Sequence, residues 1–254
     1  MKRKDKWLLR SSWVPAIIAA AAFFAGIFAA PCFGEGTGKL RQVTNVSSAN
    51  TKPPSDAIVL FDGKSTDAWT RMNGERCRWE LLPTGAMRVR GGSIITKQKF
   101  TDFQLHLEFK IPYMPEAKGQ GRGNSGVYMQ GLYEVQVLDS YGLDSKDNDC
   151  GGIYRVSRPM VNACLKPAEW QSYDVLFHSP RFDESGKMVK PARISVLQNG
   201  VWIQDNAEAW KRTTASMNEK EQDEKEPGPI LLQDHGNPVQ YRNIWIRPLG
   251  PTVR

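Results

Sequence analysis

The chain has 254 residues and a formal net charge of +7 at pH 7, and most of the excess lies at the N-terminus. Removing residues 1–34 takes away five lysines or arginines and one aspartate, which leaves a net charge of about +3. That excess is too small to indicate binding to nucleic acid, and the roughly 200 residues that follow suffice for one domain with its own core.

Residues 1–34 have the pattern of a secretory signal peptide, because a cationic start is followed by an apolar run and then by small residues. The uninterrupted apolar part, Trp13 to Ala30, is close to the lower length limit for a membrane span. We favour cleavage over anchoring, since a polar tail follows directly. Lipid attachment at Cys32 is disfavoured, because Pro31 stands where a lipobox has Gly, Ala or Ser. The leader predicts a periplasmic or secreted protein with no stable membrane insertion after its removal.

Residues 35–56 have the composition of a disordered linker, with Gly, Ser, Thr, Asn and Pro and hardly any large apolar residue. From residue 57, short apolar runs are separated by turn residues roughly every eight to twelve positions, which is typical of a β-sandwich or barrel. No helical pattern of any length and no internal repeat is present. We therefore expect a single all-β domain over residues 57–250.

The clearest periodicity lies in residues 102–111, where large apolar side chains alternate with polar ones. This alternation predicts a strand with one face in the core and the other face polar. We expect His106 and Lys110 on the polar face to be solvated. Glu108 is open to a second interpretation, since the same face of a curved sheet can form a ligand groove.

Residues 124–139 are expected to form a central hairpin, with two strands joined at Gly131. Glu134 and Gln136 are two residues apart in the second strand, so their side chains project from the same face. Asp139 lies at odd spacing from Glu134, which in a regular strand puts it on the opposite face. A β-bulge, a feature common beside active sites, would bring Asp139 back to the face of Glu134.

Glu134 has a structural and a functional interpretation, because a carboxylate on a central strand face needs a partner or a role. The structural interpretation is an ion pair with Arg242 or Lys64. His235 poses a similar choice, since it lies in a Gln-Asp-His-Gly turn between two strands. An imidazole there can exchange protons near neutral pH, or it can hydrogen-bond its own turn.

Three amide side chains can hydrogen-bond sugar hydroxyls or, equally, the backbone of the loops: Asn124, Gln136 and Gln233.

Other catalytic chemistries have little support, since the chain has no Gly-x-Ser-x-Gly elbow and no spacing of histidines that is typical of a metal site. Three cysteines follow the leader, so at most one internal bridge can form, and Cys150 and Cys164 are the better pair.

Six segments of the chain occur in an order that matches one family: LFDGK at 60–64 with Trp69, GNSGVY at 123–128, YEVQVLD at 133–139, CGGIY at 150–154, EWQSYD at 169–174, and LQDHG at 232–236 with YRNIW at 241–245. Together they resemble the 3-keto-disaccharide hydrolase domain, also described as 3-keto-glucoside 1,2-lyase and 3-keto-2-hydroxyglucal hydratase. The resemblance extends over about residues 57–248.

The resemblance implies a concanavalin-like jelly-roll sandwich of two antiparallel sheets, exported in bacteria, that acts on small sugar substrates already oxidised at C3. A ketone at C3 acidifies the hydrogen on C2, so a base can remove it and the group at C1 can leave by β-elimination. Water then adds to the unsaturated sugar, which completes a net hydrolysis. This route needs a base, an acid and stabilisation of the enolate, but not the carboxylate pair of an ordinary glycosidase.

Under this resemblance, Glu134 and His235 are the candidate base and acid, in an order that stays open. The candidates for holding sugar hydroxyls or the enolate are Asn124, Gln136, Asp139, Gln233, Arg242 and, more weakly, Lys64. No cofactor is expected, although a divalent metal on the enolate is conceivable through Glu134, Asp139 and His235. The oligomeric state is not predicted.

Two rival classes remain. The same jelly roll occurs in laminarinase-like glucanases, whose strand carries Glu-x-Asp-x-x-Glu, and the spacing of Glu134, Gln136 and Asp139 imitates that motif. Gln in place of Asp, and Asp in place of the last Glu, argue against ordinary hydrolysis. The other rival is a non-catalytic carbohydrate-binding module, because a fold alone does not confer activity.

Overall fold

The computed structural model describes residues 49–250. The leader predicted for residues 1–34 and most of the predicted linker, residues 35–48, lie outside the described residues. Between residues 49 and 250 no helix is long and apolar enough to cross a membrane. The regular structure of this part consists of strands and one short 3-10 turn, Gly119–Gly121, which confirms the all-β prediction.

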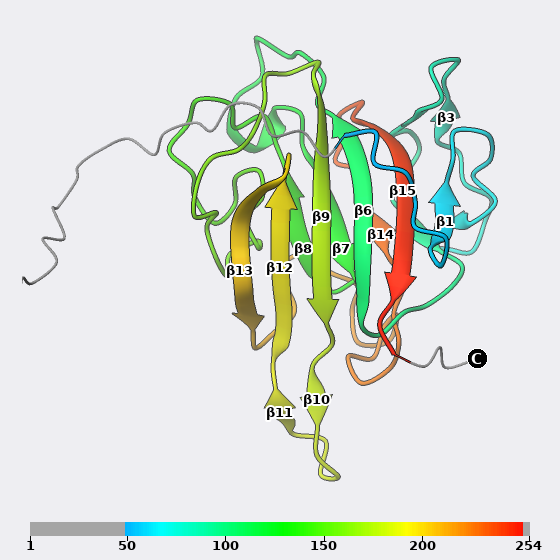
Figure 1. Cartoon of the computed structure of the whole chain (residues 1–254), viewed down its shortest axis with the longest axis vertical. Coiled ribbons are helices and arrows are strands. Elements are labelled where there is room, and N and C mark those ends of the chain that lie inside the picture. The colour runs from blue at the N-terminus through cyan, green and yellow to red at the C-terminus, as the bar shows by residue number, and fades with distance from the viewer. Residues whose placement is uncertain (1–48, 251–254) are drawn as a thin grey trace, which may run out of the picture. The chain divides into compact units, whose positions relative to one another are not determined.

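Eight strands form the larger antiparallel sheet, whose long central members stand in front in Figure 1. In spatial order they are β13 (Val201–Ala209), β12 (Ala192–Gln198), β9 (Trp170–His178), β6 (Phe103–Lys110), β15 (Gln240–Pro248), β4 (Met87–Arg88) and β3 (Glu80–Leu81), with β1 (Ile58–Phe61) also paired to β15. A two-stranded hairpin, β10 (Arg181–Phe182) and β11 (Met188–Lys190), extends beyond the ends of β9 and β12 (Figure 1).

Five strands form the smaller sheet, in the order β2 (Trp69–Arg71), β5 (Ile94–Thr96), β14 (Leu231–Leu232), β7 (Ser125–Met129) and β8 (Tyr133–Val137). The predicted hairpin is present as β7 and β8, joined by a tight turn. Gln130 and Gly131 both have positive φ in this turn, which suits the twist of two adjacent antiparallel strands.

The two sheets pack face to face, and aromatic residues bridge them. Tyr173 of β9 donates a hydrogen bond from its hydroxyl to the backbone carbonyl of Gln136 on β8, at 2.7 Å. The hydroxyl of Tyr241 on β15 lies 2.7 Å from that of Ser125 on β7. These contacts confirm the predicted sandwich of two antiparallel sheets, with the core between them.

The alternation predicted for residues 102–111 is present in β6, and Lys110 is partly exposed, but His106 is not solvated as expected. Leu105 and Leu107 point into the core and are fully buried. His106 and Glu108, on the outer face, are fully buried as well. They are covered there by side chains of neighbouring strands and by residues that precede β1, which the pattern of a single strand does not reveal.

The buried polar side chains on this outer face form one charged network. Glu108 accepts hydrogen bonds from Arg242 at 2.7 Å and from Asn243 at 2.8 Å, and His106 lies 2.7 Å from Asp174. Burial alone would raise the pKa of Glu108, but the nearby imidazole of His106 and the hydrogen bonds from Asn243 and Arg242 outweigh it and hold the pKa at about 2. The stability gained from this carboxylate is therefore present above its ordinary pKa and is lost as the pH falls towards 2.

The described end of the predicted linker contributes to this network. The backbone N–H of Asn50 donates to Glu108 at 2.6 Å, and the side-chain oxygen of Asn50 accepts from Arg242 at 3.2 Å. Asn243 donates to the carbonyl of Thr51 at 2.9 Å. Residues 50 and 51 thus lie against the larger sheet, where a disordered linker was expected.

Replacing Arg242 by Ala is expected to destabilise the fold by about 3 kcal/mol or more, because it leaves Glu108 buried with too few partners. In thermal unfolding this corresponds to a fall in Tm of roughly 6 to 12 °C for a domain of this size. The matched control is Arg193→Ala, which removes a pair of the same 2.7 Å length between two exposed side chains, Arg193 and Glu208. An equal fall in Tm for Arg242→Ala and Arg193→Ala would contradict the stabilising role assigned to the buried ion pair.

The three described cysteines, Cys77, Cys150 and Cys164, are buried, and none of them forms a disulfide with another described residue. No disulfide joins Cys150 and Cys164, the pair that the sequence favoured. The sulfur of Cys150 instead lies 3.1 Å from the hydroxyl of Tyr173, and the thiol of Cys164 faces the carbonyl of Leu138 at 3.7 Å.

Candidate active site

The site is built on the outer face of the smaller sheet. Residues that stand opposite each other in antiparallel strands point to the same side, so the strand pairing puts one side chain of each strand in a row across this face. That row consists of Glu134, Tyr128, Leu231, Ile95 and Thr70. In the adjacent row, Gln136 stands opposite Gly126.

At the β8 end of these rows lies a cavity of about 80 Å³, which is lined by Gln120, Asn124, Glu134, Gln136, Tyr154, Thr214, Ala215, Gln233 and His235. Five of the eight residues predicted for the site are among them. They come from two distant parts of the chain, which meet because β14 pairs with β7 and places the 233–235 segment beside the β7–β8 hairpin.

Glu134 is held firmly from both sides. Its backbone N–H donates to the hydroxyl of Thr213 at 3.1 Å, and its carbonyl accepts from the N–H of Tyr154 at 3.1 Å. These contacts cover the free edge of β8. A Cβ at Gly126 would collide with the carboxylate of Glu134, so only glycine leaves room for this side chain.

Glu134 is 2% exposed, and its carboxyl group forms no ion pair with any residue between 49 and 250. Burial raises the pKa of Glu134 to about 8, although a hydrogen bond from Tyr128 lowers it in part. The carboxyl group is therefore mostly protonated at pH 7. A strongly raised pKa in a polar hollow is typical of a catalytic acid or base.

Two buried amide oxygens in the cavity lack a hydrogen-bond donor among the described residues. Asn124 uses its amide nitrogen for the carbonyl of Gln120 at 2.7 Å, and its oxygen has no partner. Gln233 donates to the hydroxyl of Tyr128 at 2.9 Å, and its oxygen likewise has no partner. Leaving a buried acceptor unpaired is costly, so both oxygens are suited to accept hydroxyl groups of a ligand.

Gln136 differs from the other two amides, because both ends of its side chain are engaged. Its nitrogen donates to the side-chain oxygen of Gln120 at 3.0 Å, and its oxygen accepts from the N–H of Val137 at 3.0 Å. Gln136 therefore fixes the wall of the cavity, whereas hydroxyl binding was predicted for it.

The turn that carries His235 is anchored on both sides. The side chain of Asp234 accepts from the N–H of Gly92 at 2.8 Å, and that of Asn237 accepts from the N–H of Asn124 at 2.7 Å. The ring of His235 is exposed at the cavity and has no hydrogen bond to any described residue. His235 therefore does not hydrogen-bond its own turn, which was the structural interpretation of this residue.

Three predicted residues lie outside this cavity. Arg242 is bound to Glu108 on the larger sheet, because its neighbour Tyr241 points into the core and the arginine must face the other way. Lys64 is exposed and pairs with Asp62 at 3.4 Å. The predicted positions of these two residues beside Glu134 are wrong, and neither forms the ion pair with Glu134 that we considered.

Asp139, the third, pairs with Arg122 at 3.1 Å and does not line the cavity. The conceivable metal site of Glu134, Asp139 and His235 is not assembled, since residues 49–250 contain no group of three His, Cys, Asp or Glu side chains placed to hold an ion.

The sequence interpretation missed four lining residues: Gln120, Tyr154, Thr214 and Ala215. Tyr154 ends one of the six family segments, so its position was marked although no role was assigned to it. The other three lie in irregular segments without a periodic pattern, and only their packing brings them to the cavity.

Comparisons with known proteins show the family and the fold of this chain. Residues 56–247 match the 3-keto-alpha-glucoside-1,2-lyase-like domain. A 3-keto-disaccharide hydrolase of Bacteroides thetaiotaomicron is 25% identical over 250 residues, which cover 77% of this chain and 80% of that protein.

Among solved structures, one from Parabacteroides distasonis that is described as a glycosyl hydrolase is 42% identical, with a TM-score of 0.71 over 77% of this chain and 85% of the other. A second structure from the same organism is 20% identical, with a TM-score of 0.57 over 77% of this chain and 94% of the other, and supports the fold alone.

Proposed function

This chain belongs to the 3-keto-alpha-glucoside-1,2-lyase-like domain family, and we propose that it cleaves glycosides whose sugar carries a ketone at C3. The observation that carries the proposal is the cavity of Glu134. It combines a buried carboxyl of raised pKa, an accessible imidazole and two unpaired amide oxygens. A polyhydroxylated ring can hydrogen-bond to all of these groups at once, and few other ligands can.

The proposed reaction has three steps. The base removes the C2 hydrogen, which the C3 ketone has acidified, and an enolate forms. The bond between C1 and the glycosidic oxygen then breaks, and the acid protonates the leaving oxygen, which departs as an alcohol. Water finally adds across the C1–C2 double bond, so that the net change is hydrolysis of the glycoside.

We assign the acid to Glu134 and the base to His235. The environment of Glu134 raises its pKa to about 8, so it holds a proton at neutral pH and can donate it. The ring of His235 reaches the cavity and carries a nitrogen that can accept the C2 proton. The exposed position of His235 at the cavity also gives it access to solvent, with which it can exchange the proton that it removes.

The two unpaired oxygens, on Asn124 and Gln233, are assigned to the hydroxyl groups of the keto-sugar. They accept but do not donate, so they select for hydroxyls over charged acceptors such as carboxylates. The hydroxyl of Tyr128, bound by Gln233 and next to Glu134, positions the acid.

The laminarinase-like alternative is less well supported by this geometry. Ordinary glycosidases place two carboxylates on either side of the scissile bond. Here Glu134 is the only carboxylate that lines the cavity among the described residues, and Asp139 is paired with Arg122 outside it.

The proposal is tested by offering the purified protein a 3-keto-glucoside and the same glucoside without oxidation at C3, and following products by NMR. Turnover of the keto form alone is expected, because only the ketone acidifies C2. Equal turnover of both forms would favour ordinary hydrolysis. Binding of either sugar without any product would favour the non-catalytic binding module.

A further inference from the structure

The enolate of the proposed reaction carries its negative charge on the oxygen at C3, and a hydrogen-bond donor at that oxygen lowers the barrier to its formation. Arg242, one of the residues predicted to hold hydroxyls or the enolate, is bound to Glu108 on the larger sheet. No lysine or arginine is among the described residues that line the cavity of Glu134. The donor therefore has to be another polar group of this cavity.

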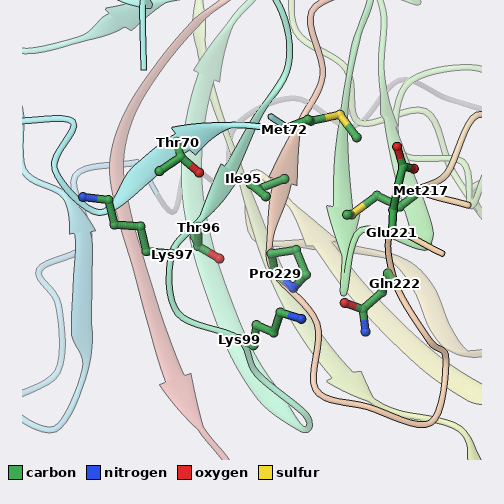
Figure 2. Close-up of a pocket in the computed structure, with 10 residues that line it drawn as sticks. All are labelled: Thr70, Met72, Ile95, Thr96, Lys97, Lys99, Met217, Glu221, Gln222 and Pro229. Carbon is green, nitrogen blue, oxygen red and sulfur yellow. The ribbon is translucent and has the colours of Figure 1, made fainter. Parts of the chain in front are cut away.

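Two lysines on the same sheet are too distant to serve. Lys97 and Lys99 line a separate cavity of about 260 Å³ next to β5 (Figure 2). Strands β14 and β7 lie between β5 and β8, so three strand spacings, about 14 Å, separate β5 from the strand of Glu134. The charge of an enolate beside Glu134 must be held by the lining of the first cavity.

Most donors of this lining are already engaged. Each amide nitrogen donates to a protein atom at 2.7–3.0 Å, in Gln120, Asn124, Gln136 and Gln233. The hydroxyl of Tyr128 accepts from Gln233 and is hydrogen-bonded to Glu134. Glu134 and His235 carry out the two proton transfers. These groups are therefore committed to the protein or to proton transfer.

Two hydroxyl groups of the lining, on Tyr154 and Thr214, have no hydrogen-bond partner among the described residues. Tyr154 is half-buried, whereas Thr214 is exposed. A phenol donates more strongly to an oxyanion than an alkyl hydroxyl does, and a donor shielded from water stabilises charge better than a hydrated one. Tyr154 is thus the better donor for the enolate.

Tyr154 stands directly beside Glu134 on the outer face of the smaller sheet. Val135 of β8 pairs with Ile153 in an isolated antiparallel bridge. The next residues along stand opposite each other, and the N–H of Tyr154 donates to the carbonyl of Glu134 at 3.1 Å. Opposite residues point to the same side, with their Cβ atoms about 5 Å apart. Tyr154 therefore extends the row of Glu134 and Tyr128 by one position.

A tight turn fixes the backbone of Tyr154. The N–H of Ile153 donates to the carbonyl of Ser157 at 2.9 Å, and the N–H of Ser157 donates to the carbonyl of Ile153 at 3.0 Å. Arg155, inside the turn, has a φ of 56°, and its guanidinium lies 5.9 Å from the centre of the Tyr154 ring. A positive charge there stabilises negative charge that moves towards the phenol.

We propose that Tyr154 is a catalytic residue, which donates a hydrogen bond to the oxygen at C3 and so stabilises the enolate. This inference rests on the proposed function, because it names the group that holds the charge of that reaction. The oxygens on C1 and C3 of a sugar ring are separated by only three ring carbons. The acid of Glu134 and the phenol of Tyr154, adjacent in one row, are placed to reach both oxygens together.

The phenol keeps its proton throughout the reaction. His235 takes the C2 hydrogen as a proton, the electron pair of the C2–H bond forms a double bond between C2 and C3, and the carbonyl pair moves onto the C3 oxygen. Tyr154 shares its hydrogen with that oxygen. When the bond from C1 to the leaving oxygen breaks, the C3 carbonyl forms again, a C1–C2 double bond forms, and the leaving oxygen takes the proton of Glu134.

The test is Tyr154→Phe in the full chain, with a 3-keto-glucoside as substrate. We expect kcat to fall roughly 100- to 1,000-fold, the usual loss for one oxyanion donor, with KM within about threefold. Exchange of the C2 hydrogen in heavy water, followed by NMR, should slow by the same factor because it passes through the same enolate. The Tm should stay within about 2 °C, since the hydroxyl bonds to no described residue.

The matched control is Tyr141→Phe, which should change neither rate. Tyr141 is also accessible and has a cation, Lys166, 5.8 Å from the centre of its ring, but it does not line the cavity. A second variant, Thr214→Val, removes the other unpaired hydroxyl of the lining. A large loss in Thr214→Val with Tyr154→Phe unaffected would give the role to Thr214 and overturn the proposal.

The remaining outcomes separate this proposal from the proposed function. If the unaltered protein cleaves the keto-sugar and Tyr154→Phe does so within tenfold, Tyr154 is not the donor while the function stands. Exchange at full rate with cleavage lost, a loss confined to KM, or a strong fall in Tm would each overturn the role at the enolate. If the unaltered protein neither exchanges nor cleaves a 3-keto-glucoside, the proposed function fails and the role of Tyr154 fails with it.

Discussion

Glu134→Gln is expected to lower kcat for a 3-keto-glycoside by 100- to 10,000-fold, the usual range for the loss of a positioned proton donor. Gln has the shape of a protonated Glu, so it fits the room that Gly126 leaves. The substitution removes the transferable proton and little else. The measurement is steady-state turnover of a 3-keto-glycoside, followed by NMR or by release of the leaving alcohol.

The stability of the same variant separates chemistry from folding. Burial raises the pKa of Glu134 to about 8, so the folded protein resists ionisation of this group and loses stability as the pH rises from the ordinary pKa of Glu to 8. A neutral Gln removes this penalty. Glu134→Gln should therefore unfold at the same temperature as the unaltered protein, or a higher one, at pH 8. A strong fall in Tm would show that Glu134 is structural.

The pH dependence follows from the same pKa. An acid must be protonated to act, so kcat/KM is expected to fall above pH 8, by about tenfold for each further unit. A rise in activity through pH 8 would instead make Glu134 the base and reverse the two assignments.

His235→Asn is expected to lower kcat by at least 100-fold, because the base that removes the C2 hydrogen is lost. The fold should be unaffected, within about 0.5 kcal/mol, since the imidazole is exposed and bonds to no described residue. The matched control is His178→Asn, an exposed histidine on the larger sheet, which should leave activity unchanged.

Hydrogen exchange at C2 of the substrate distinguishes the two roles. In heavy water, a working base exchanges the C2 hydrogen for deuterium even when the leaving group cannot depart. Glu134→Gln should therefore retain exchange while cleavage is lost, and His235→Asn should lose both. Retention of exchange in the His235 variant would remove this residue from the role of base.

Local patterns were sufficient for several features of this protein. The alternation in residues 102–111 predicted which side chains of β6 enter the core, since strand side chains alternate between faces whatever the strand pairs with. The same rule put Glu134 and Gln136 on one face. The six family segments indicated the sandwich and the class of sugar chemistry.

The residues that each strand face contacts in the folded protein could not be predicted in this way. Arg242 was expected beside Glu134, yet β15 joins the larger sheet and turns this side chain towards Glu108. His106 on the outer face of β6 was expected in solvent, yet residues 50 and 51 and the neighbouring strands cover this part of the face. The sequence of a strand predicts how its two faces differ in polarity, but it does not predict which residues each face contacts.

By itself, the sequence determined the all-β class, the β7–β8 hairpin and the shared face of Glu134 and Gln136, because these depend on dihedral preferences and side-chain period over a few residues. Only the tertiary structure decided that His235 and Gln233 stand beside Glu134, and that Asn124 and Gln233 each keep an oxygen unpaired. Those features depend on which distant strands pair and on which polar atoms remain once the chain has satisfied the others.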